Sequence, residues 1–407
     1  MSAVAEAWNR LFLLRAAATD RLALDRELLL ARIAFGDERA LDDVPEEERG
    51  ALLEALVYRA RATPTLAKAI DEGSLAQALW AGHARDGDDA RAIVARMFAG
   101  RQPAPSELDA ALARLPLGLR DDGAAAYAER RVFTHEASEY SAVAAIRDPA
   151  RRLRAMADVA ARTRLSPLVA HAWALDADDI AMRLTTEPAR LATTLSEVAL
   201  LCAMAGQRED CTSLLEAALT SLGRITTAAA FAQVFAATLR PAAMLGFERW
   251  QAIVEQAHAE RALFRDAKAF LEVRIAALRT LPRAIANTPA SSTADLGHAI
   301  DRGHSLMKEV TRRLPDAALD LFHHTTIIAL LATVPGRALD VPLTALRELL
   351  RKHPLPPARV DGAAPITLDD IVEPLATRAP EVLIGLSETF TRPEDGARWL
   401  LAALPML

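Results

Sequence analysis

The sequence predicts an all-α protein, and three observations carry that prediction. The first is composition, because 52% of the 407 residues are hydrophobic and Ala, Leu, Arg and Glu dominate, which are strong helix formers. The second is that the 22 prolines tend to fall between periodic apolar segments. The third is that the chain lacks alternating Val, Ile, Thr and Tyr runs separated by hairpin turns. The length fits two or three domains, or one extended array.

An internal repeat orders the helices in the middle of the chain. The segment "DPARRLRAMADVAART" at 148–163 aligns with "EPARLATTLSEVALLC" at 187–202 after a shift of 39 residues, so that the acid, the Pro-Ala-Arg and the apolar stripe coincide. The same shift aligns "LLEAA" at 214–218 with "IVEQA" at 253–257. A fixed period of this size is typical of stacked helical hairpins, because one hairpin cannot bury its apolar face alone.

Each repeat is expected to begin at a proline and to turn at a glycine. Pro149 and Pro188 each follow an acidic residue, and proline fits a first helical turn because its missing N–H has no partner there. Gly206, in the polar turn "AGQRED", lies where a helix should end. We expect residues 149–222 to form two successive helix pairs. The predicted fold is a right-handed stack of antiparallel helical hairpins, α-solenoid-like, with less regular helical N- and C-terminal regions.

The repeat unit is similar to those of known helical-repeat families. The segment "AGQREDCTSLLEAAL" resembles the turn and second helix of tetratricopeptide-type repeats, where a Gly turn precedes small and Leu positions. The period is longer than the ~34 residues usual there, and HEAT-type repeats, with periods near ~40, are the alternative. The resemblance covers about residues 148–279. Stacks of either kind create long concave surfaces that suit protein or peptide partners.

Periodicity and loop signals divide the chain into three predicted regions. Residues 1–140 are a helical region without the repeat, residues 141–285 are the repeat core, and residues 295–407 are a C-terminal helical region. The best linker is "ANTPASSTADLG", before the third region. That region should contain a long apolar helix with Pro315 in its first turn, and the amphipathic segment "TRPEDGARWLLAALPML" should form the last helix and cap the array.

Charge and hydropathy restrict the class of partner. The net charge is −6, and only four of the 48 basic residues are lysine. Nucleic-acid binders usually carry a basic domain, so the overall balance argues against a nucleic-acid partner without excluding a local basic patch. The N-terminal segment lacks the basic start of a secretory signal. The apolar run "TTIIALLATVPG" is shorter than the ~20 residues of a membrane helix. We expect a cytoplasmic protein without a membrane span.

One segment begins like the zinc-protease motif. "HEASEY", from His135 to Tyr140, supplies the first His and the Glu of that motif. The motif requires a second His four residues after the first, so that both face the metal from one side of a helix. Glu139 stands at that position. We therefore interpret the segment as an exposed helix end.

A second segment, "DDIVE", resembles the aspartate-rich motif of isoprenoid synthases through Asp369, Asp370 and Glu373. The resemblance implies carboxylates that hold magnesium on a diphosphate. The alternative is a helix start at which Thr367 and Asp370 form a capping pair. This alternative also has Pro374 interrupting the helix immediately afterwards, and we find no second carboxylate motif. We favour the helix start.

Two histidine groups are further candidates for a metal site. His323 and His324 are adjacent, so on a helix they point about 100° apart and cannot chelate one ion together. His298 and Asp301 share a helix face, with His304 three residues further on. Carboxylate–histidine metal sites use such neighbours. We interpret both groups as ordinary helix-surface side chains, because a further ligand is missing.

The two cysteines and an arginine cluster complete the candidates. Cys202 and Cys211 lie about five residues on either side of the turn centre, which places them at the same level of a hairpin. We expect a buried, reduced packing pair near Gly206, since Cys is among the most buried residues. The arginine cluster "RRLRAMADVAARTR" is interpreted as a solvated face, although it could hold an acidic partner. Its members are Arg151, Arg152, Arg154, Arg162 and Arg164.

None of these candidates forms a complete set, so we assign no catalytic, cofactor-binding or metal-binding residues and no cofactor. The predicted function is a non-enzymatic protein–protein interaction or scaffold module. One alternative is an all-helical metal-dependent enzyme of isoprenoid-synthase type. Another is a structural subunit of a larger bacterial assembly, which predicts exposed apolar patches. An enzyme should show a closed pocket with converging carboxylates or histidines, whereas a scaffold should show an open groove.

Overall fold

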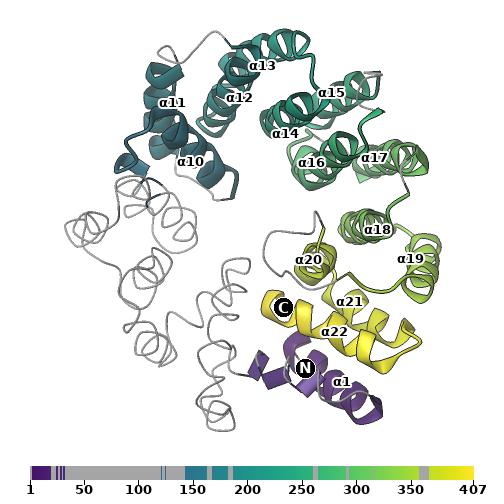
Figure 1. Ribbon diagram of the computed structural model, residues 1–407. Helices are drawn as coiled ribbons and strands as arrows, with labels where there is room; N and C mark the ends of the chain where they lie inside the picture. Colours follow the sequence, from purple (N-terminus) through teal and green to yellow (C-terminus); the bar gives the residue numbers. More distant parts are fainter. Residues whose placement is uncertain are drawn as a thin grey trace. The chain divides into compact units, whose positions relative to one another are not determined.

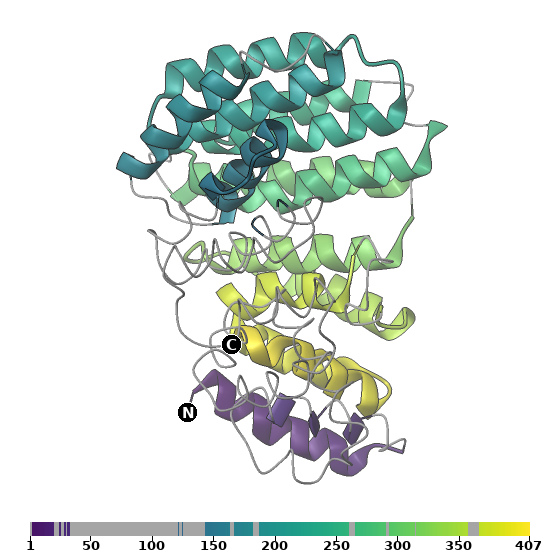
Figure 2. The ribbon, with the colours of Figure 1, turned by 60° about the vertical axis from the view of Figure 1, so that its left-hand side comes forward.

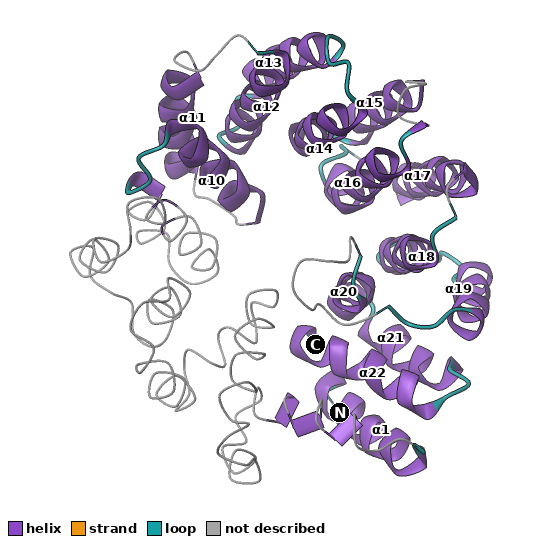
Figure 3. Cartoon of the chain, in the orientation of Figure 1, coloured by secondary structure: helices purple, strands orange, loops and turns teal. Residues whose placement is uncertain are grey.

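The structure is a computed structural model, and it describes a large part of the chain. The described stretches are residues 2–19, 143–162, 167–181, 187–259, 265–289, 293–313, 315–356 and 366–407, with a few single positions between 24 and 124. In these stretches every regular element is a helix, as Figure 3 shows. The all-α class predicted from the sequence is therefore confirmed.

The chain packs as two compact units. Unit 1 comprises residues 1–101 and 311–407, and unit 2 comprises residues 102–310. The two units are described separately below. The division into three regions that the sequence suggested stays a prediction, since most of residues 1–140 lies outside the described stretches.

Unit 2 contains two rows of helices, which Figures 1 and 2 show from two sides. We call α10, α12, α14 and α16 the even row and α11, α13 and α15 the odd row. Along the even row, α10 packs against α12, α12 against α14, and α14 against α16, while α13 of the odd row packs against both α12 and α14. The bounds are α10 (Pro149–Arg162), α11 (Pro167–Ala181), α12 (Pro188–Met204), α13 (Arg208–Leu222), α14 (Ala228–Leu245), α15 (Phe247–Ala259), α16 (Ala267–Ala286) and α17 (Thr293–Arg313).

The local signals of the repeat lie where the sequence predicts them. Pro149 begins α10 and Pro188 begins α12, so both prolines open helices. The α12 helix ends at Met204, and Gly206 follows with a φ of 82°, a conformation that glycine adopts without strain. The Gly206 N–H donates to the Ala203 carbonyl (3.1 Å) and ties the turn to the helix. The turn between α12 and α13 is thus fixed by residues that the sequence analysis identified.

The core of unit 2 is apolar and includes one buried polar link between the rows. Trp250 on α15 is fully buried, and its indole N–H donates to the Thr280 hydroxyl of α16 (2.8 Å). Buried indoles usually find such a partner, because an unsatisfied N–H in an apolar core is costly. At the end of α14, the Arg208 guanidinium of α13 donates to the Leu245 carbonyl (2.9 Å). This bond satisfies one of the terminal carbonyls that a helix leaves open.

The helix Ala228–Leu245 is long and apolar enough to cross a membrane by length and composition alone, whereas the run at 325–336 belongs to a shorter apolar helix. Half of the window in α14, 50%, is buried inside unit 2. The helix packs against α12, α13, α15 and α16. A central core helix meets the same length and composition test, so this finding is weak evidence for a membrane span.

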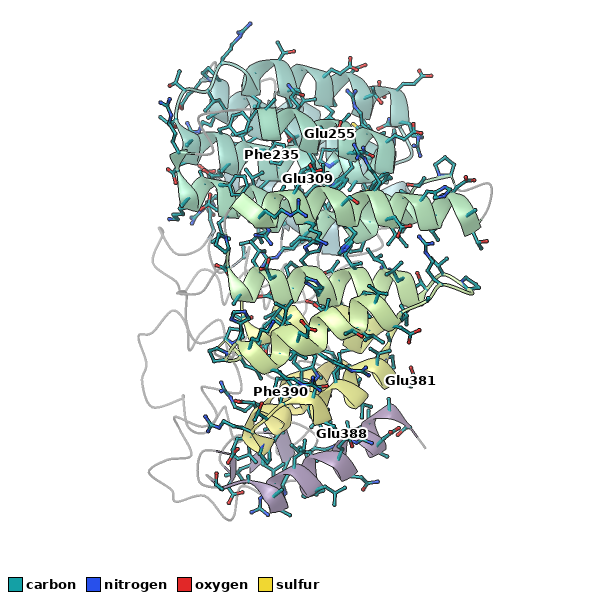
Figure 4. All side chains as sticks on the ribbon, turned by 90° about the vertical axis from the view of Figure 1, so that its right-hand side faces the viewer. Phe235, Glu255, Glu309, Glu381, Glu388 and Phe390 are labelled. Carbon is teal, nitrogen blue, oxygen red and sulfur yellow. The ribbon has the colours of Figure 1, made fainter. Side chains whose placement is uncertain are left out.

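Unit 1 brings helices from both ends of the chain together. Its described helices are α1 (Ala3–Ala17), α18 (Ala317–Ala332), α19 (Asp340–Lys352), α20 (Leu368–Arg378), α21 (Pro380–Leu386) and α22 (Pro393–Ala403). The α1 helix packs against α21 and α22. The Thr19 N–H and hydroxyl both donate to the buried Glu394 carboxylate (2.7 Å each). Arg10 forms an ion pair with Glu388 (2.7 Å), which Figure 4 shows beside α1.

Two details of unit 1 differ from the sequence prediction, and both concern prolines. The apolar helix α18 begins at Ala317, with Asp316 as its N-cap, so Pro315 precedes the helix instead of lying in its first turn. Pro374 lies inside α20, which continues to Arg378. A proline removes one backbone N–H but need not end a helix that packing holds in place. Here Ile371 and Leu375 on either side of it are fully buried.

Candidate functional site

The carboxylates of "DDIVE" form a helix start in the structure. The Thr367 hydroxyl and the Asp370 carboxylate form a capping box: the Thr367 N–H donates to Asp370 Oδ2 (2.9 Å), and the Asp370 N–H donates to Thr367 Oγ1 (3.4 Å). The predicted capping pair is therefore confirmed. Asp370 is engaged in local backbone bonding, which is a structural role at this position.

The two histidine groups are separated by burial. His323 is buried, and the ring of His324 beside it is half-buried and lies with Nδ1 2.8 Å from the Asp320 carbonyl. The two rings are tilted by 45° with centroids 5.4 Å apart. On α17, His298 and Asp301 are exposed and His304 is half-buried. Among the described residues, no group of three or more His, Cys, Asp or Glu side chains is placed to hold one metal ion.

The cysteines behave as predicted from their spacing. Cys202 ends the buried face of α12 and Cys211 lies in α13, and both are buried and free of any disulfide. Burial, and then the nearby Cys202 thiol, raise the pKa of Cys211 to about 12. A thiol with that pKa remains protonated at neutral pH and is a poor nucleophile. The pair therefore contributes packing at the turn.

The remaining sequence candidates are only partly visible. Residues 135–140 lie outside the described stretches, and so does Arg164. Arg152 of α10 forms an ion pair with Asp176 of α11, which links the two helices. Arg151 and Arg154 are exposed. The arginine cluster thus combines one helix-to-helix contact with side chains at the surface.

The odd row contains a contact that the sequence analysis aligned without interpreting. Glu216 on α13 accepts from Arg249 on α15 (3.1 Å). Glu255 on α15 accepts from Arg302 on α17 (2.9 Å), and Figure 4 labels this glutamate. Glu216 and Glu255 are the two glutamates that the shift of 39 residues superimposes. Matched positions of the repeat therefore make matched contacts, each with an arginine of the following odd-numbered helix.

Two arginines of the even row, which the sequence analysis did not single out, make long reaches along that row. Arg240 on α14 donates to the Ala157 carbonyl of α10 (2.7 Å). Arg283 on α16 donates to the Met204 sulfur of α12 (3.4 Å). Each guanidinium passes the intervening helix and ends on the second helix along. A signal was present in the sequence, because Thr-Leu precedes both positions, in "TLRP" and "TLPR".

The electrostatics of these two arginines differ from those of an isolated side chain. Burial, and then the positive charge of Arg240, lower the pKa of Arg283 from its usual value. Both side chains are half-buried. Two like charges at close range in a partly desolvated place favour an anion between or beside them. The even row is therefore the part of the described structure with the clearest potential to recognise a ligand.

Searches with the chain find no matching family model, no matching curated protein and no matching solved structure.

Proposed function

We propose that the protein is a non-enzymatic interaction or scaffold module of the cytoplasm that binds a protein or peptide partner. In this proposal the helices of unit 2 form an α-solenoid-like stack of antiparallel hairpins, with a degenerate repeat of the tetratricopeptide or HEAT type. Such stacks use one row of helices as an extended binding surface.

The single observation that carries the proposal is the pair of matched contacts in the odd row. If the shift of 39 residues were an accident of composition, Glu216 and Glu255 would have no reason to make equivalent ion pairs with α15 and α17. The matched contacts support a real repeat, and a real repeat supports an extended surface. The even row, with its alternation of apolar packing and long arginine reaches, supplies that surface.

The test is capture and reconstitution. The full chain, immobilised through an added C-terminal tag, is exposed to lysate of the organism that encodes it, and enriched proteins are identified by mass spectrometry. Each candidate is then produced alone and titrated against the chain by isothermal calorimetry. We expect at least one partner to bind with defined stoichiometry in the purified system. If no enriched protein binds when purified, the proposal is wrong.

A second measurement separates the proposal from the metal-dependent enzyme. Thermal unfolding is followed with and without magnesium and inorganic diphosphate. We expect no stabilisation, because Asp370 is used in the cap at Thr367. A ligand that binds only the folded state raises the unfolding temperature. Stabilisation that disappears in Asp369→Asn and Glu373→Gln variants would contradict the proposal and support an enzyme.

A further inference from the structure

The two rows of unit 2 carry opposite charge. Among the side chains that the structure describes, the even row has nine basic residues and two acidic residues, whereas the odd row has two basic residues and six acidic residues. The even-row members are Arg151, Arg152, Arg154, Arg190, Arg240, Lys268, Arg274, Arg279 and Arg283 against Glu197 and Glu272. The odd-row members are Arg208 and Arg249 against Asp176, Glu209, Asp210, Glu216, Glu248 and Glu255.

This separation is local and runs against the composition of the whole chain, whose net charge is −6. Random placement of charges on helices would give each row a similar balance. A surface of one sign raises the local concentration of ligands of the other sign and speeds their association. The even row is therefore suited to an acidic ligand.

Arg240 and Arg283 lie at the centre of this row and on its open side. Arg240 reaches from α14 past α12 to the Ala157 carbonyl of α10. Because α13 packs against both α12 and α14, the Arg240 side chain crosses the other face of α12. Arg283 crosses α14 in the same way on its path from α16 to Met204. Both guanidinium groups are thus on the side of the even row that faces away from α13.

The partners of these two guanidinium groups leave room for a stronger acceptor. A main-chain carbonyl and a thioether are neutral, and a thioether is a weak acceptor. Hydrogen bonds from an arginine to a carboxylate are shorter and roughly twice as strong as those to neutral acceptors. The planar guanidinium also matches a carboxylate in two parallel bonds. An acidic side chain of a partner would therefore improve on the contacts that each arginine makes with Ala157 and Met204.

The aromatic residues of the even row argue against single-stranded nucleic acid as the ligand. Such ligands stack their bases on accessible aromatic side chains. The aromatic residues of the four even-row helices are Phe231, Phe235 and Phe270, and all three are buried. The charge of the row therefore stands without a stacking platform, and an acidic polypeptide segment fits it better.

We propose that the even row binds an acidic segment of a partner protein, with carboxylates of that segment held by Arg240 and Arg283. This inference rests on the proposed function and names the surface and the chemistry of the partner. Extended acidic segments are common in disordered regions, which bind by wrapping along a surface. Binding should be dependent on salt, because exposed charges are screened.

The test uses a short fluorescein-labelled peptide in which Glu and Leu alternate, with fluorescence polarisation as the readout. The control peptide carries Gln in place of every Glu. We expect the acidic peptide to bind the full chain and the Gln peptide to bind at least about tenfold more weakly, which corresponds to the loss of one or two charge-assisted hydrogen bonds. Addition of salt should weaken binding of the acidic peptide only.

The double variant Arg240→Gln/Arg283→Gln should weaken binding of the acidic peptide by at least about tenfold. The matched control is Arg302→Gln, which removes the same charge from α17, where Arg302 pairs with Glu255. Circular dichroism melting confirms that the variants are folded. If the double variant does not fold, the exposed pair Arg190→Gln/Arg279→Gln in the same row tests the same surface.

Four results would overturn the inference. They are absence of binding by the acidic peptide, equal loss in Arg302→Gln and the double variant, tighter binding of a single-stranded RNA of equal charge, and self-association by light scattering that the double variant abolishes. The proposed function fails separately. If a purified partner binds the wild-type chain and the double variant equally, the interaction module stands and the even-row inference is wrong.

Discussion

Gly396 on α22 lies where no other residue fits. A Cβ atom added there would lie 2.4 Å from the main-chain oxygen of Ser387, a distance that real Cβ contacts do not show. The obstacle is backbone, in a segment that packs directly against α22, so it cannot rotate away as a side chain would. Gly396→Ala gains about 1 kcal/mol in helix propensity. The overpacking cost is about 1–3 kcal/mol or more, so we expect a net loss of about 1–2 kcal/mol in the free energy of unfolding.

Gly385 on the neighbouring helix α21 supplies the matched control. It lies in the same unit and inside a helix, and an added Cβ would meet nothing within 4 Å. Gly385→Ala should therefore stabilise by about 0.5–1 kcal/mol. The assay is hydrogen exchange by mass spectrometry on the α21–α22 peptides, with urea unfolding by circular dichroism as a global readout. The reasoning is refuted if Gly396→Ala is as stable as the wild-type protein while Gly385→Ala gains stability.

Three further outcomes are expected. Burial holds the pKa of Cys211 at about 12 against an ordinary 9.0, so the free energy of unfolding should fall as pH rises from 9.0 towards 12, and a thiol reagent should modify this residue at neutral pH only after denaturation. Glu255→Gln removes the ion pair with Arg302, in which both side chains are largely exposed, and should cost less than about 1 kcal/mol by chemical denaturation, an effect that high salt erases. Thr367→Ala should cost about 1 kcal/mol through the lost cap of α20, measured by thermal melting, whereas Asp369→Asn should be nearly neutral.

Local signals in the sequence predicted local structure well. Pro149 and Pro188 open helices, and Gly206 lies in a turn with positive φ, because each choice depends on one or two backbone groups at that position. The cysteine pair followed from its symmetric spacing about the same turn. These features need no knowledge of neighbouring helices.

Features that depend on packing were predicted less well. Pro374 was expected to end its helix, yet α20 continues past it to Arg378. The Thr377 hydroxyl donates to the Glu373 carbonyl (2.9 Å), and apolar residues on both sides of Pro374 are buried against other helices. The cost of one lost backbone hydrogen bond is offset by tertiary burial, and that burial cannot be read from the proline itself.

The charge separation between the rows shows why the candidate surface escaped the sequence analysis. Net charge averages the basic even row with the acidic odd row, and the average of −6 argues against any basic surface. The repeat supplies the missing step, because in a chain of helix pairs every second helix belongs to the same row. Once Pro149 and Pro188 are taken as starts of equivalent helices, charges can be counted row by row instead of along the chain. Only the structure shows that Arg240 and Arg283 extend past a neighbouring helix, which makes them the residues whose replacement tests the function most directly.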